Sequence, residues 1–384
     1  MTEVRIDGET RRDHRTRVAA ERRPRDLTAG APAMSGSHLP SLAGVRFAGG
    51  AVVFACHAIV LLPDAEPGLL GAGMSMVSMF FVLSGFIMAW AHRPGDTARA
   101  FYRRRFARIY PAYFVAVTAA IVVSLVYAGF SPLNLLPYTL IQAWFPDPMA
   151  HFAANAVFWS LSCEAFMYAI FPFVAILLHR ASARLLWGLA ATCTALAVVI
   201  GVVATFLWGD PVVQWFVYVF PPMRVPEFLL GVALGFLARK GLRVRMPVWL
   251  ATVFAVLAVM GASFAPPGLQ IIAVTIVPLT LMILALATSD IEERRSFFSH
   301  PVSVMLGSWS FSFYLLHGMI LAWMILLADV LELPLVLGAV LAFPASLVAS
   351  WLMYEFVERR FARLLRPRVR APRLPATLAV SSAT

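Results

Sequence analysis

Basic residues lie almost entirely between the apolar segments of this chain and at its ends, and this distribution strongly limits the possible folds. Of 31 Lys and Arg residues, 29 lie in the tails or in and just after the even-numbered connections between apolar runs. The odd-numbered connections carry only acidic charges. This alternation follows the positive-inside rule. Each run has about the 20 residues that a helix needs to cross a bilayer, and the ten runs are 42–62, 72–91, 107–129, 152–178, 184–208, 212–238, 246–264, 268–288, 302–327 and 333–357.

The pattern therefore predicts an all-α, polytopic membrane protein with about ten transmembrane helices and both termini in the cytoplasm. Apolar residues make up 60% of the chain and the mean hydropathy is +0.79, which excludes a soluble domain. Residues 1–38 and 362–384 are polar and rich in Arg, and we expect them to be disordered cytoplasmic tails. Residues 39–361 form the transmembrane domain, and we expect a multi-pass protein of the cell membrane.

The net charge of +11 does not indicate a nucleic-acid-binding surface. Much of it comes from the flanks of the apolar runs, where basic residues set orientation and can contact anionic membrane lipids. The three cysteines all lie within apolar runs, so no disulfide framework is predicted. No metal site is expected.

A few ionisable residues lie inside the apolar runs, where charge is costly and usually faces a cavity or a partner. We estimate that most of them lie at similar depth in the middle to outer half of the bilayer. A shared polar cavity is more favourable than separate exposure of each to lipid. These residues are Arg46, His57, Glu164, Arg224, Glu227 and His317.

Arg46 and His57 are eleven residues apart in the first run. Eleven helical steps bring both to one face, separated by ~16 Å along the axis. This geometry suits a long ligand with an anionic head near the cytoplasm and a reactive group deeper in the membrane. The alternatives are that Arg46 is an interfacial anchor and that His57 is a packed histidine bonded to a neighbouring helix.

Arg224 and Glu227 are three residues apart and can form an ion pair that lowers the cost of burial. That pair could be purely structural. Glu164 could equally be a packing carboxyl bonded to Trp or Tyr, and His317 a satisfied core histidine. The nearby prolines, 221, 222 and 226, predict a broken span.

Arg105 and Arg108 form an Arg-x-x-Arg pair at the cytoplasmic start of the third run. Arginines at a helix N-terminus can bind phosphate through bidentate hydrogen bonds and the helix dipole. The alternative is that they serve only to orient the span.

Read in order, these segments resemble the acyltransferase type 3 family of integral membrane O-acyltransferases. The resemblance covers residues 39 to about 361. The local sequences around His57 and Glu164 are most similar to those of actinobacterial members that acylate macrolides. The sequence departs from the family pattern after Cys163 and at Arg360. The segments that carry the resemblance are Leu42–Arg46 with His57, Phe80–Phe86, Phe101–Pro111, Trp159–Tyr168 with Pro172, Arg224–Gly231, Ser310–His317 and Val357–Phe361.

The resemblance implies transfer of an acyl group, most simply acetyl, from acyl-CoA to a hydroxyl of a carbohydrate, lipid or macrolide acceptor. Arg46, Arg105 and Arg108 would then hold the CoA phosphates. His57 would act as general base or as nucleophile. Glu164 could orient a histidine ring.

Under the same reading, Arg224 and His317 could stabilise the oxyanion, and Glu227 would pair with Arg224. Two other functions stay open from the sequence. One is a proton-coupled transporter that uses the intramembrane His, Glu and Arg residues as a relay. The other is a non-enzymatic partner in envelope-glycan assembly.

Overall fold

A computed structural model describes residues 39–364, apart from 64, 67, 94, 128 and 130. The predicted tails lie outside these residues, except that the last helix continues to Leu364. The described regular structure is helical, and the α-helices are α2 (Pro40–Leu61), α3 (Met76–Trp90), α4 (Ala98–Tyr127), α5 (Pro148–His151), α6 (Trp159–Leu178), α7 (Ala183–Leu207), α8 (Pro211–Gln214), α9 (Val225–Arg239), α10 (Val248–Ala262), α11 (Ile276–Ile291), α12 (Pro301–Val330), α13 (Leu335–Met353) and α14 (Arg359–Leu364).

Shorter helices of other kinds join or extend these. The 3₁₀ helices are η1 (Gly68–Ser75), η2 (Pro132–Thr139), η3 (Gln142–Trp144), η4 (Ala156–Phe158), η6 (Pro221–Arg224) and η8 (Phe297–Ser299). The π-helices are η5 (Trp215–Val219), η7 (Leu269–Ala273) and η9 (Tyr354–Glu358).

The structure confirms an all-α, multi-pass fold. Within the described residues, eight helical segments are long and apolar enough to cross a membrane. A ninth forms if the pair Pro211–Val219 and Pro221–Arg239, bent by 51°, is one span. The bend lies at the predicted proline break, because proline has no backbone N–H to continue the helix. The run predicted at 246–264 is a shorter helix, α10, of 15 residues.

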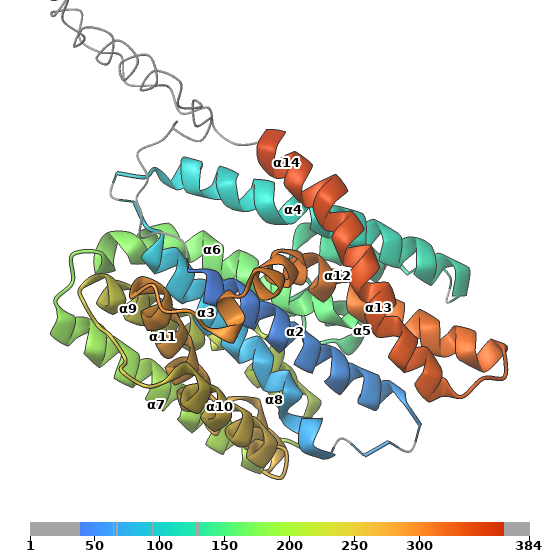
Figure 1. Cartoon of the computed structure of the whole chain (residues 1–384). Coiled ribbons are helices and arrows are strands. Elements are labelled where there is room, and N and C mark those ends of the chain that lie inside the picture. The colour runs from blue at the N-terminus through green and yellow to red at the C-terminus, as the bar shows by residue number, and fades with distance from the viewer. Residues whose placement is uncertain are drawn as a thin grey trace, which may run out of the picture. The chain divides into compact units, whose positions relative to one another are not determined.

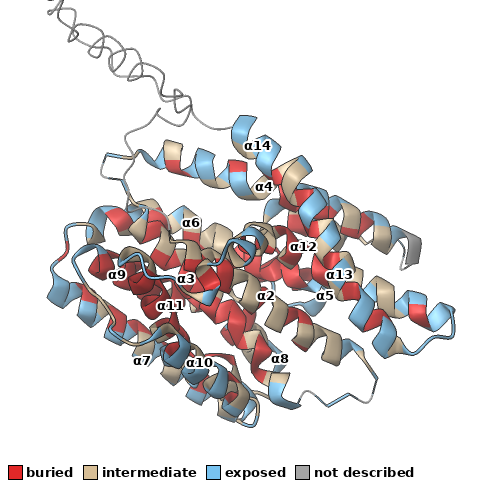
Figure 2. Ribbon diagram, viewed as in Figure 1, coloured by how far each residue is buried: buried red, intermediate tan, exposed pale blue. Residues whose placement is uncertain are grey.

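Helices α3, α9 and α11 form the interior of this domain, and Figure 2 shows their surfaces largely buried. α3 packs along α9 (Figure 1) at very short range. A Cβ atom on Gly231 would lie 1.9 Å from the carbonyl oxygen of Val82, and one on Gly85 would lie 2.1 Å from that of Phe228. The two backbones approach this closely only because both positions are glycine.

The helix α2 packs against α12, which in turn packs against α13. Close contact again depends on a glycine, since a Cβ atom on Gly307 would lie 2.2 Å from the carbonyl oxygen of Ala43. This packing places Arg46 and His57 of α2 beside the helix that carries His317.

Candidate functional site

His57 and His317 form a direct pair between α2 and α12. His57 Nδ1 lies 3.0 Å from His317 Nε2. The ring planes differ by only 4° and the centroids are 5.2 Å apart, so the rings meet edge to edge through the two nitrogens. His317 is fully buried and His57 is half-buried. The pair therefore has one half-buried member, His57, held by one fully buried member, His317.

The backbone of α12 fixes the proton positions in this pair. His317 Nδ1 lies 2.9 Å from the carbonyl oxygen of Tyr314 and 3.2 Å from that of Phe313. Carbonyl oxygens only accept, so this nitrogen carries the hydrogen, and the neutral ring accepts at Nε2. His57 Nδ1 must then donate, which leaves a free lone pair on His57 Nε2. The arrangement repeats the logic by which a catalytic histidine is held in one tautomer by its neighbour.

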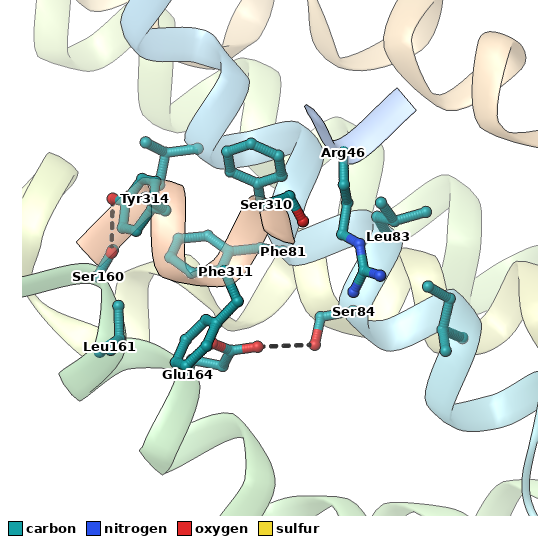
Figure 3. Close-up of a pocket in the computed structure, with 13 residues that line it drawn as sticks. Arg46, Phe81, Leu83, Ser84, Ser160, Leu161, Glu164, Ser310, Phe311 and Tyr314 are labelled. Carbon is teal, nitrogen blue, oxygen red and sulfur yellow. Dashed lines mark hydrogen bonds between the residues drawn. The ribbon is translucent and has the colours of Figure 1, made fainter. Parts of the chain in front are cut away.

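A cavity of ≈ 120 Å³ lies between α2, α3, α6 and α12 (Figure 3). Its polar wall combines one cation, one carboxyl group and several hydroxyl groups. Arg46 projects into it from α2, and its Nε has no hydrogen-bond partner among the described residues. Such an orphaned buried donor in a polar cavity is suited to an anionic or carbonyl-bearing ligand. The polar lining residues are Arg46, Ser84, Ser160, Glu164, Ser310 and Tyr314.

Glu164 lies in this cavity and not beside His57. It accepts hydrogen bonds from Ser84 Oγ at 3.3 Å, as drawn in Figure 3, and from the Tyr168 hydroxyl. Glu164 is also within electrostatic reach of Arg46. The sequence analysis considered Glu164 as the residue that orients a histidine ring. In the structure, the residue beside His57 is His317.

Tyr314 links the cavity to the histidine pair. Its hydroxyl is 2.7 Å from Ser160 Oγ on the cavity wall, and its ring centroid is 5.7 Å from that of His317. The signal for it was present in the sequence, because Tyr314 precedes His317 by about one helical turn.

A second cavity, of ≈ 230 Å³, lies between α4 and α6 and shares Leu161 and Glu164 with the first. Arg105 lines it, with its guanidinium 5.4 Å from the Phe101 ring centroid and 5.6 Å from that of Tyr168. Arg108, one turn further along α4, is exposed. The Arg-x-x-Arg segment is therefore partly anchored on aromatic rings and partly free.

Arg224 occupies a different environment. It is 1% exposed, forms a 2.9 Å ion pair with Glu227 and donates to Ser78 Oγ at 2.9 Å. Its guanidinium lies between the rings of Phe81 and Tyr218, at 5.4 and 5.3 Å. Only Phe81 of this group lines the Arg46 cavity, so Arg224 lies behind the cavity wall. These contacts correspond to the structural ion pair considered from the sequence.

Comparison with known proteins identifies the family. Residues 39–355 match the acyltransferase domain Acyl_transf_3. The chain belongs to the acyltransferase type 3 family. Acyltransferase MdmB of Streptomyces mycarofaciens is 35% identical, with 88% of this chain and 96% of that protein covered. A shorter match, 30% identical over 32% of this chain and 34% of the relative, is "Putative acetyltransferase ORF330" of Acidianus two-tailed virus. No solved structure matches the chain.

The acyltransferase match spans every membrane residue singled out from the sequence. In this membrane acyltransferase, the structure joins them into two neighbouring groups and one separate pair. His57 and His317 form the first group, and Arg46 and Glu164 share the cavity that forms the second. The separate pair is Arg224 with Glu227.

Proposed function

We propose that this membrane acyltransferase moves a short acyl group, most simply acetyl, from acyl-CoA to a hydroxyl of a glycan, lipid or macrolide-type acceptor. The observation that carries the proposal is the His57–His317 pair. It leaves the lone pair of Nε2 free on the half-buried His57, which is the protonation state that a general base requires.

The acyl-CoA donor would bind with its phosphates at three arginines. Arg105 and Arg108 at the start of α4 would hold the CoA phosphates, together with Arg46. α2 is unbroken from Pro40 to Leu61, so the axial separation of Arg46 and His57 is ~16 Å. The pantetheine arm would span this distance and bring the thioester past Tyr314 toward His57.

The chemistry then follows from the proton positions. His57 Nε2 takes the proton of the acceptor hydroxyl while the oxygen attacks the thioester carbonyl carbon. The tetrahedral intermediate collapses with cleavage of the C–S bond, and the CoA sulfur leaves with the proton that His57 carried. His317 stabilises the charged His57 ring through the hydrogen bond from His57 Nδ1. This role replaces the oxyanion contact considered for His317 from the sequence.

A binding experiment tests the donor site without knowledge of the acceptor. Acetyl-CoA at about 100 times its Kd should stabilise the purified protein by about 2.7 kcal/mol, measured as a shift in Tm in detergent. R105A/R108A should lose this shift. R180A/R184A removes two exposed arginines just before and at the start of α7 and should retain the shift. A wild-type protein that neither acetyl-CoA nor a longer acyl-CoA stabilises would contradict the proposal.

The base is tested separately. H57A should bind acetyl-CoA like the wild type but lose acyl transfer by roughly 10²- to 10⁴-fold. Acyl transfer at the wild-type rate by folded H57A would rule out His57 as base or nucleophile.

A further inference from the structure

Glu358 is a buried carboxyl group that the proposed reaction does not use. It is 4% exposed and accepts a hydrogen bond from Ser312 Oγ, which is fully buried on α12. Ser312 lies five residues before His317 on the same helix. A buried carboxylate is unfavourable unless it is paired or serves a function.

A π-helix turns Glu358 inward. The buried stripe of α13 follows steps of three or four residues through Ser346, Ser350 and Met353. The next buried residue is Glu358, five positions on, across the π-helix η9. A regular helix would bring Val357 to this face. π-helical turns of this kind are frequent at functional sites.

The inward position brings Glu358 to the arginines of the donor site. η9 packs against α4 and α12. Arg46 and Arg108 both lie within electrostatic reach of the Glu358 carboxylate. The two guanidiniums also lie close enough to repel each other. Glu164 also acts on Arg46 from the cavity, but Glu358 interacts with both arginines from a helix that packs against α4. Without the Glu358 charge, the exposed Arg108 side chain would be expected to move away from Arg46 into solvent.

We propose that Glu358 is a positioning residue of the donor site. Its carboxylate, fixed by Ser312, offsets the repulsion between Arg46 and Arg108 and holds both guanidiniums together for the anionic groups of the acyl donor. This inference rests on the proposed function. It assigns Glu358 to donor binding and not to the chemical step.

The chain provides a matched control three residues away. Glu355 lies on the same π-helix, but its carboxylate pairs at the surface with Arg359 at 2.7 Å. E358Q and E355Q each remove one negative charge. Gln at 358 keeps an oxygen that can accept from Ser312, so the packing is preserved while the charge is lost.

Steady-state kinetics and calorimetric titration with acetyl-CoA test the inference. E358Q should raise KM and Kd about tenfold, as expected for loss of a charge-assisted contact, with kcat at saturating donor within about twofold of wild type. E355Q should match wild type. In an R108A background, E358Q should raise Kd less than about twofold further, because interacting residues are not additive.

A Kd of E358Q equal to that of E355Q, or tighter than wild type, would overturn the inference, as would a loss of kcat at unchanged KM. If E358Q does not fold, S312A keeps the carboxylate but frees it, and should raise KM to a smaller extent. An unchanged KM in S312A would then overturn it. Failure of the wild type to bind acetyl-CoA would refute the proposed function and this inference together, whereas equal binding by wild type and E358Q refutes the inference alone.

Discussion

The proton arrangement in the histidine pair predicts a large difference in activity between two substitutions of His317. H317Q can place an amide oxygen near the position of Nε2, where it still accepts from His57 Nδ1. H317N places its amide near the position of Nδ1 and leaves His57 Nδ1 without an acceptor. H317Q should therefore retain most of the acyl-transfer activity, and H317N should not.

The size of the effect follows from the contacts. His317 is fully buried, so its Nε2 lies out of contact with solvent. A buried donor without a partner costs about 1–3 kcal/mol. The reaction needs His57 in one orientation and one tautomer. If H317N makes that state less stable by about 1–3 kcal/mol, kcat/KM should fall about 5- to 150-fold. Most of this range lies below the loss expected for H57A, which removes the base itself.

The assay is acetyl transfer in detergent or proteoliposomes, with the Tm and the acetyl-CoA Kd as controls for folding and donor binding. The reasoning requires the order wild type, H317Q, H317N and H57A from most to least active. Folded H317N with wild-type kcat/KM would refute the assignment of His317 as the residue that positions His57. So would an H317Q protein as inactive as H57A.

Three further predictions concern stability and use unfolding in detergent. R224M should destabilise the protein by about 3–5 kcal/mol, because Glu227 is left buried without its partner; R224M/E227L should recover much of this loss. G231A should separate α3 from α9 and destabilise, whereas G188A, with nothing within 4 Å, should change stability by less than about 1 kcal/mol. Burial lowers the pKa of His151 below its ordinary 6.5, so the unfolded chain binds a proton that the folded one does not. Stability should fall as pH drops below about 6.5, and H151Q should flatten this dependence.

The sequence predicted which segments are helical but not which of them form the interior. All ten apolar runs contain helix, because apolar segments of this length must satisfy their backbone polar groups internally. Hydropathy does not separate the core from the periphery. The segment Leu269–Ile291 has a hydropathy of 2.5 and is 78% buried, whereas Ala183–Leu207 has 2.3 and is 28% buried. Lipid and protein interior are equally apolar solvents for a side chain.

A better signal for the interior was the spacing of small residues. Gly231 and Gly235 are four apart on α9, the spacing that allows close approach of two membrane helices. Both positions lie against the backbone of α3. The π-helices were not predictable in this way, since an inserted residue changes the buried face without changing composition.

The residues of the candidate site were largely identifiable from the sequence, but their partners were not. His57 and His317 both stood out as ionisable groups in apolar runs, yet they are 260 residues apart. Their contact depends on the rotation of α2 and α12 about their axes, which the glycine contacts between these helices help to fix. The same uncertainty in rotation allowed Glu164 to be considered beside His57, whereas the structure places it beside Arg46.

The two arginines inside the membrane segments, Arg46 and Arg224, differ in how far neighbouring side chains compensate their charge. Arg224 is matched by a carboxylate at 2.9 Å, a hydroxyl at 2.9 Å and two aromatic rings, so its burial is compensated within the fold. Both arginines leave Nε without a hydrogen-bond partner among the described residues. Arg46, however, lines a cavity and has neither an ion pair nor a hydrogen bond to another described side chain. A charge that the fold leaves incompletely satisfied in a membrane helix points by default to a functional site. We infer that the compensating group is the acyl donor, so loss of Arg46 should weaken donor binding more than it weakens the fold, and loss of Arg224 should do the reverse.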